Sequence, residues 1–216
     1  MEGANLFDWS SLLPPYLLDS EKDRLSKALK QFKRNSSESG EIDYSGFYLS
    51  NPPQTLLQGD LIVSAVRPFW NVHQDIFESM YSRVLLISNS CDVSSDNKRN
   101  IQKDAVFAPI IPFSEYEKDM EEKGFSRIKI DSVFMQIKRQ SFSNLFFLPN
   151  PNGSDSGYIV LLDQLFSLPN SEVEKMSNNL ITSRFKTLDN FGSYLLIVKL
   201  SFHFCRVPEE VERRSV

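Results

Sequence analysis

One segment restricts the folds open to this chain more than any other: Arg83-Val-Leu-Leu-Ile-Ser-Asn-Ser-Cys-Asp92. Its apolar run stops abruptly in small polar residues, and a thiol and a carboxylate follow at once. A continuous apolar run bounded by turn-forming residues is typical of a buried strand, whose polar end brings side chains to a surface. The segment therefore predicts a strand over 83–88 and a polar corner at its end, where chemistry could take place.

Neighbouring segments predict a sheet around this strand. The stretch that opens with Gly59-Asp60 predicts a strand over 59–66, and an apolar run predicts another over 105–111. Between the first two strands, residues 67–82 are rich in aromatic side chains and predict a long connection. These three strands are expected to form one antiparallel, twisted sheet.

Two shorter apolar runs follow, at 144–148 and 158–162, on either side of Pro149-Asn-Pro-Asn-Gly153. Proline, asparagine and glycine favour turns for separate physical reasons, so their concentration here is a strong turn signal. The two runs therefore predict a pair of short strands, possible partners in a hairpin.

Four helices are predicted beside the strands. The first begins with Ser20 as its cap, and its apolar residues recur at helical spacing: Leu25, Ala28, Leu29 and Phe32. The others are predicted over 115–123, 129–140 and 188–206. The chain thus divides into an N-terminal arm and helix (1–55), a core with a helical insertion (56–165) and a C-terminal helical segment (166–216).

Composition narrows the classes of function. The 216 residues carry a net charge of −4, so the whole chain lacks the basic footprint of a nucleic-acid-binding protein. No stretch approaches the roughly 18 apolar residues of a membrane span, and the first residues lack the basic and apolar regions of a secretory signal. The two cysteines, Cys91 and Cys205, are most simply free thiols. We therefore expect a cytoplasmic protein that does not bind membranes.

The order of these motifs resembles the PemK/MazF family of bacterial toxins over residues 56–112. The matching segments are Gly59-Asp60, Arg83 with Leu85-Leu86-Ile87-Ser88-Asn89, and Ala108-Pro109-Ile110. The resemblance implies an α+β fold: a small, mostly antiparallel PemK-like β-barrel, here flanked by N-terminal and C-terminal helices. Many members cut single-stranded RNA without a metal ion, using the arginine before the second strand and a hydroxyl near its end. Those residues would be Arg83 and either Ser88 or Ser90.

This chain departs from the family pattern at two places. Val84 stands where the family has a proline after the arginine, and Ile111-Pro112 replaces the threonine that follows Pro-Ile. A second resemblance, over more of the chain, is to uncharacterised bacterial proteins with a Ser-x-x-Cys-Asp motif after such a strand. Ser88-Asn-Ser-Cys-Asp92 fits that motif, and Leu200-Ser-Phe-His-Phe-Cys-Arg206 is similar to the helix that ends those proteins.

The polar corner has two interpretations. Cys91 could be a nucleophile, but a reactive thiol needs a nearby base or cation, and only His73 and His203 could supply an imidazole. In the alternative, Cys91 is shielded and structural, and the Asp92 carboxylate accepts N–H bonds from residues 93–95. The spacing of cysteines and histidines does not match zinc sites, so neither a metal nor a cofactor is expected.

Other residues could meet phosphate or a base. Arg83 could stabilise phosphate charge, or it could pair with an acid such as Asp60. Trp70 could stack on a base. A small basic cluster follows the corner and could contact RNA: Lys98, Arg99 and Lys103.

Three functions remain open from the sequence. The first is a bacterial antiphage-defence or toxin–antitoxin protein that recognises single-stranded RNA, or a protein encoded in the same operon, through a degenerate catalytic site. The second is an active, metal-independent endoribonuclease that uses Arg83 with Ser88 or Ser90. The third is an enzyme that depends on Cys91. A homodimer is compatible with each of them.

Overall fold

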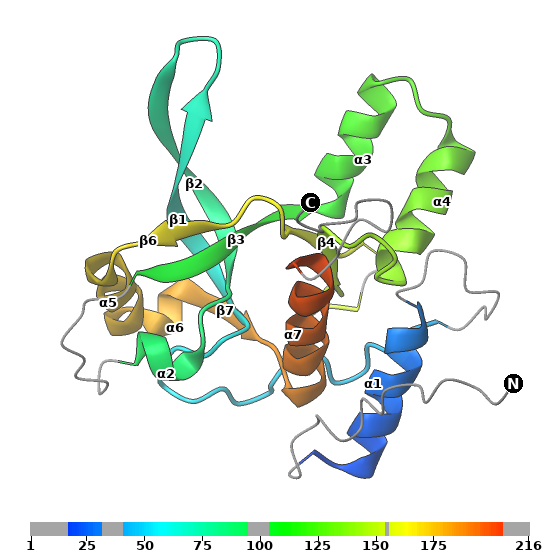
Figure 1. Ribbon diagram of the computed structural model, residues 1–216, viewed down its shortest axis with the longest axis horizontal. Helices are drawn as coiled ribbons and strands as arrows, with labels where there is room; N and C mark the ends of the chain where they lie inside the picture. Colours follow the sequence, from blue (N-terminus) through cyan, green and yellow to red (C-terminus); the bar gives the residue numbers. More distant parts are fainter. Residues whose placement is uncertain (1–16, 32–40, 95–103, 154–155, 205–216) are drawn as a thin grey trace, which may run out of the picture.

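A computed structural model describes residues 17–31, 41–94, 104–153 and 156–204 of the chain (Figure 1). At its centre lies a seven-stranded sheet in which all the strand pairs are antiparallel. The strands are β1 (Asp60–Asn71), β2 (Ile76–Leu86), β3 (Ala105–Pro112), β4 (Leu145–Leu148), β5 (Tyr158–Leu161), β6 (Phe166–Leu168) and β7 (Arg184–Thr187). Their order is β4-β5-β3-β2-β1-β7, and β6 also pairs with β3.

Seven helices accompany the sheet in the described part of the chain. They are α1 (Asp19–Gln31), α2 (Ser90–Val93), α3 (Phe113–Glu122), α4 (Arg127–Lys138), α5 (Asn170–Asn178), α6 (Leu180–Ser183) and α7 (Asn190–Phe204). The α+β class and the mostly antiparallel sheet are therefore confirmed.

The predicted closed barrel is not formed, because the sheet is open between β4 and β7. Both end strands find other hydrogen-bonding partners. The Gln140 side chain bonds to the backbone of Phe147 in β4, and the backbone N–H of Leu49 donates to Thr187 in β7 over 2.9 Å. A covered edge no longer needs another strand, so the sheet is completed without closing on itself.

Helices cover both faces of the sheet (Figure 1). On one face, α1 and α7 pack against β1 and β2 in a cluster that includes Leu25, Leu195, Leu61 and Leu85. The opposite face carries two separate clusters. One joins α5 and α6 to β1, β2, β3 and β6, and the other joins the α3–α4 pair to β4 and β5.

The prediction for residues 67–82 was wrong, because these residues extend β1 and β2 into a long hairpin. Beyond the contacts with β3 and β7, seven register pairs from Ala65–Ser82 to Asn71–Ile76 continue as a two-stranded ribbon. Residues 65–82 are called the arm here, and in Figure 1 the arm stands away from the sheet. Asn71 organises its turn, since its side-chain oxygen accepts hydrogen bonds from the backbone N–H groups of His73 and Gln74.

Most predicted helices form close to their predicted limits. The helix predicted from Ser20 is α1, but Leu18 occupies the cap position, and its N–H donates to the Glu21 side chain over 3.0 Å. The predicted helix at 129–140 is α4, which begins earlier, at Arg127. The C-terminal segment, predicted to be helical, also contributes β6 and β7 to the sheet.

Candidate functional site

The corner after β2 is held together by its serine hydroxyls. The Ser88 hydroxyl accepts a hydrogen bond from the backbone N–H of Val106 over 2.8 Å, which ties the end of β2 to β3. The Ser90 hydroxyl accepts one from the N–H of Gln58 over 2.9 Å, and the Gln58 side chain donates to the carbonyl of Ile87 over 2.6 Å. Both hydroxyls therefore satisfy backbone donors, which is a structural role.

Cys91 and Asp92 lie in the short helix α2, whose cap is Asn89. The Asn89 side-chain oxygen accepts the N–H of Cys91 over 2.9 Å and so caps the helix. That the Asp92 carboxylate accepts N–H bonds from residues 93–95 stays a prediction, because residue 95 lies outside the described residues. Cys91 is exposed, against the prediction of a shielded thiol. The described histidines lie elsewhere: His73 belongs to the turn of the arm, at the far end of β2, and His203 contacts Phe204 on α7.

Arg83 lies in β2, away from the two serines. It pairs in register with Ile110 of β3, whereas Ser88 bonds to Val106, which lies four residues before Ile110 in the same strand. At about 3.3 Å per strand residue, Arg83 and Ser88 are roughly 15 Å apart along the sheet. The guanidinium of Arg83 lies 5.8 Å from the ring centre of Tyr158 instead. The arrangement does not bring the predicted arginine and hydroxyls together at one reacting atom.

Asp60 has a different partner from the one suggested by sequence. Its carboxylate is buried, lies 3.3 Å from the Arg184 guanidinium and accepts hydrogen bonds from Thr187 and from the N–H of Leu57. Burial raises the pKa of the Asp60 carboxyl, and these three partners oppose the rise. Arg184 also donates to two backbone carbonyls, at Pro53 and Thr55, so the pair anchors the chain before β1.

The predicted basic cluster Lys98, Arg99 and Lys103 lies outside the described residues. Trp70, the predicted stacking residue, lies near the end of the arm and makes an edge-to-face contact with Phe77, with ring centres 4.8 Å apart. Among the residues described, no group of three or more His, Cys, Asp and Glu side chains could hold a metal ion. None of the helices that the structure describes is long and apolar enough to cross a membrane.

The arm has two chemically different faces. Residues paired directly across antiparallel strands lie on the same face, so the pairs Val66–Tyr81, Pro68–Ser79 and Trp70–Phe77 share one face. These six residues are called the aromatic face here, and none of them carries a charge at neutral pH. The opposite face mixes charged and apolar side chains, since Arg67 and Glu78 lie there beside Phe69, Ile76 and Met80. Arg67 also donates to Gln164 over 2.6 Å.

The aromatic face is exposed to a degree that is unusual for its chemistry. Phe77 is 77% exposed, Tyr81 75% and Trp70 45%, and Val72 beside the turn is 79% exposed. Contiguous apolar surface of this kind marks interaction sites. Sequence reasoning identified Trp70 alone. The available signal was the spacing of Trp70, Phe77 and Tyr81 on either side of the turn that begins at Asn71, which indicates a hairpin with its aromatic residues on one side.

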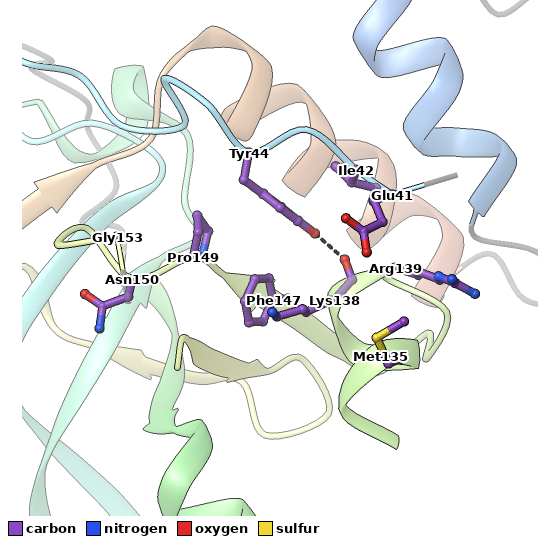
Figure 2. Close-up of a pocket in the computed structure, with 10 residues that line it drawn as sticks. All are labelled: Glu41, Ile42, Tyr44, Met135, Lys138, Arg139, Phe147, Pro149, Asn150 and Gly153. Atoms are coloured by element: carbon purple, nitrogen blue, oxygen red, sulfur yellow. Dashed lines mark hydrogen bonds between the residues drawn. The ribbon is translucent and has the colours of Figure 1, made fainter. Parts of the chain in front are cut away.

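A cavity of about 330 Å³ forms a second candidate (Figure 2). It lies between residues 41–44, the end of α4 and the turn after β4, and its lining includes Lys138, Arg139 and Glu41 around the rings of Tyr44 and Phe147. Tyr44 donates to the carbonyl of Lys138 over 2.6 Å, which closes one side of the cavity.

A buried polar node shares Tyr44 and Phe147 with this cavity. It consists of Tyr44, Gln140, Lys199 and the backbone of Phe147. The Gln140 amide donates to the Phe147 carbonyl and accepts from the Phe147 N–H, each over 3.1 Å, and it also donates to the Tyr44 hydroxyl. The amine of Lys199 donates to the backbone carbonyl of Gln140. Burial lowers the pKa of that amine from 10.5 to about 7. Lys199 has no solvent exposure and is not among the residues that line the cavity.

A scan against models of protein families finds no match for this chain, and a search of curated proteins finds none either. The chemistry of the arm, of the corner after β2 and of the node is therefore the evidence for what this protein does.

Proposed function

We propose that this protein is a non-catalytic recognition protein and that the arm is the surface through which it binds a protein partner. The observation that carries the proposal is the aromatic face, which combines high exposure with the absence of charged side chains. Protein interfaces are enriched in tyrosine, tryptophan and phenylalanine, and their centres are depleted of charge.

A degenerate catalytic site agrees with this proposal. The roughly 15 Å between Arg83 and Ser88 is too far for both to act on one phosphate, and the hydroxyls of Ser88 and Ser90 already accept backbone hydrogen bonds. The resemblance to PemK/MazF toxins over 56–112 supports a toxin–antitoxin or defence setting, in which binding a partner protein from the same operon is itself a function.

The test compares two substitutions on the same strand. Phe77→Asp places a charge on the aromatic face, and Met80→Asp places the same charge on the opposite face, where Met80 is 48% exposed. Each protein is cross-linked in cells that express the whole operon. We expect a heterologous partner protein to be captured by the wild type and by Met80→Asp, but not by Phe77→Asp. Equal capture by all three would exclude the arm as the recognition surface.

Single-stranded RNA is the second candidate, because the row formed by Phe77 and Tyr81 leads along β2 to Arg83, which lies over Tyr158. Aromatic rows with nearby arginines stack bases and pair with phosphate. Fluorescence anisotropy with a labelled single-stranded oligoribonucleotide tests it. Binding that weakens with salt and with both Phe77→Asp and Arg83→Ala would favour RNA over a protein partner.

A further inference from the structure

We propose that the cavity at the end of α4 is a binding site for a small aromatic acid, a planar apolar ring that carries one carboxylate. The cavity measures about 330 Å³, at the lower end of the roughly 300–1,000 Å³ of small-molecule sites. Three segments that lie far apart in the sequence build it: residues 41–44, the last turn of α4 and the turn after β4 (Figure 2). No residue of the arm lines it, so the inference goes beyond the proposed function.

Aromatic rings form the apolar part of the lining. The rings of Tyr44 and Phe147 meet edge to face with their centres 5.3 Å apart, and Ile42 adds to this surface. The Tyr44 hydroxyl has its partners inside the fold, since it donates to the carbonyl of Lys138 over 2.6 Å and accepts from Gln140 over 3.1 Å. Tyr44 therefore offers a ligand its ring rather than its polar group. Surfaces of this kind favour a flat, apolar ring.

The polar part of the lining carries two cations, Lys138 and Arg139, and one carboxylate, Glu41. Among the residues that the structure describes, neither cation forms an ion pair. The amine of Lys138 lies 4.6 Å from the ring centre of Phe134, which holds the charge in place without neutralising it. Two cations and one carboxylate leave the lining with a net charge of +1. A ligand with one negative charge balances this lining.

Arg139 supplies the observation that points to an acid. Its Nε is buried and has no hydrogen-bond partner within the described part of the chain. Buried donors in folded proteins are nearly always bonded, to the protein, to water or to a ligand. A carboxylate matches a guanidinium, because its two oxygens accept two parallel hydrogen bonds from the same side chain. Binding of an acid would therefore satisfy this donor and pair both cations.

The backbone around the cavity favours a carboxylate over a phosphate. Phosphate sites use free N–H groups, as at a helix N-terminus or in a loop that directs several of them inward. This cavity instead lies at the C-terminal end of α4. In the turn after β4, the N–H groups of Asn152 and Gly153 already donate to Asn150, over 2.9 Å and 3.0 Å. A phosphate monoester, with about two negative charges, would also exceed the charge of the lining.

NMR titration of the isotope-labelled full chain with cinnamate and with its neutral amide, cinnamamide, tests the site. The two probes share a ring and a shape and differ in charge. We expect cinnamate to shift the backbone signals of Ile42 and Gly153, which line the cavity from separate segments. Its dissociation constant should be on the order of 1 mM, as for a ligand of about 11 non-hydrogen atoms. Cinnamamide should bind at least about tenfold more weakly, because it cannot form charge-assisted hydrogen bonds.

Two substitutions test the cations directly. Lys138→Met and Arg139→Met each remove a charge and keep an unbranched side chain, and each should weaken cinnamate binding at least about fivefold. Lys129→Met is the matched control, because Lys129 lies on α4 at an exposed position that does not line the cavity. It should leave the dissociation constant unchanged. The spectrum of each variant without ligand shows whether it is folded.

Three outcomes would overturn the inference. The first is the absence of a saturable shift at the lining residues up to about 20 mM cinnamate, well above the expected dissociation constant. The second is equal binding of cinnamamide, or an affinity for cinnamate that neither Lys138→Met nor Arg139→Met changes, because the cations would then not hold the acid. The third is tighter binding of phenyl phosphate than of cinnamate, which would assign the cavity to phosphate esters. None of them decides the proposed function, since capture of a protein through the arm is measured separately in cells.

Discussion

The arm and the polar node depart from ordinary burial in opposite directions. The arm exposes large aromatic side chains, with Phe77 77% exposed, whereas the node buries an amide and an amine, with Gln140 1% exposed and Lys199 fully buried. Buried polar groups and exposed apolar patches are the informative exceptions in a folded protein. The arm and the node differ in where the partners of their unusual side chains lie.

The node is satisfied from within the chain. Gln140 joins α4, β4, residue 44 and α7 through its amide and its carbonyl, and its backbone adopts a positive φ of 58° to reach them. Among the residues that the structure describes, none covers the aromatic face of the arm in this way: Trp70 and Phe77 contact each other and remain exposed. A region with internal partners serves stability, and a region without them is available for binding. Substitutions in the two regions should therefore affect different measurements.

The largest expected effect is that of Gln140→Ala. It removes three side-chain hydrogen bonds and leaves the buried N–H and carbonyl of Phe147 without this partner. Since each unsatisfied buried group costs about 1–3 kcal/mol, we expect a loss of about 3 kcal/mol in the free energy of unfolding, measured by urea denaturation.

Two variants qualify this result. Gln140→Gly should lose about 1 kcal/mol less than Gln140→Ala, because glycine adopts the positive φ without strain. Gln136→Ala, at a partly buried position of α4, the helix that ends just before Gln140, should change the free energy of unfolding by less than about 0.5 kcal/mol. If Gln140→Ala were as mild as Gln136→Ala, the node would not be a stabilising feature.

The next effect concerns pH. The pKa of Lys199 is about 7 in the folded protein against 10.5 in the unfolded chain, because burial disfavours the charged amine. Between these values the unfolded chain binds a proton that the folded protein does not, so stability rises with pH. At about 1.4 kcal/mol per pH unit, the expected gain between pH 7 and pH 9 is about 2 kcal/mol.

This window stays below the titration of the tyrosines. Burial raises the pKa of Tyr44 and Tyr48, so the unfolded chain loses their protons first, and stability falls as pH approaches their ordinary value of 10. Lys199→Met should remove the rise between pH 7 and pH 9 while leaving that later fall in place. A rise of the same size in Lys199→Met would assign it to another group.

The sequence predicts the parts of this fold in which apolar residues form a continuous run or recur at helical spacing. The apolar runs of β2, β3, β4 and β5 and the helical stripe of α1 were predicted, because burial in a core selects long apolar patterns. Strand β7, Arg-Phe-Lys-Thr, was missed because it is four residues long and contains two cations. Residues 67–82 predict a connection rather than strands, because no core selects a continuous apolar run there.

The candidate sites follow the same division. Arg83, Ser88, Ser90, Cys91 and Asp92 are neighbours in sequence, but strand geometry separates Arg83 from the others. Gln140 and Lys199 are far apart in sequence and meet only in the fold. Neither their residue types nor their spacing could therefore predict the node. The aromatic face likewise depends on the register of β1 against β2. The turn between the two strands sets that register, and composition does not reveal it.

A smaller effect is expected at Asn89, which is exposed like the arm but has an internal partner like the node. Asn89→Ala removes the cap of α2 and should lower the free energy of unfolding by about 1 kcal/mol, measured by thermal or urea denaturation. Cys91→Ser in the same turn should change it by less than about 0.5 kcal/mol. A negligible loss at Asn89 would mean that burial, rather than an internal partner, distinguishes the node from the arm.

The smallest expected effect on stability is in the arm itself. Phe77→Asp should change the free energy of unfolding by less than about 0.5 kcal/mol, measured by urea denaturation, because Phe77 is 77% exposed and contacts Trp70 at one edge. Met80→Asp, on the opposite face of the arm, should have an equally small effect, because Met80 is 48% exposed. A large loss in Phe77→Asp alone would instead mean that the aromatic face supports the fold of the chain, and the contrast between arm and node would fail.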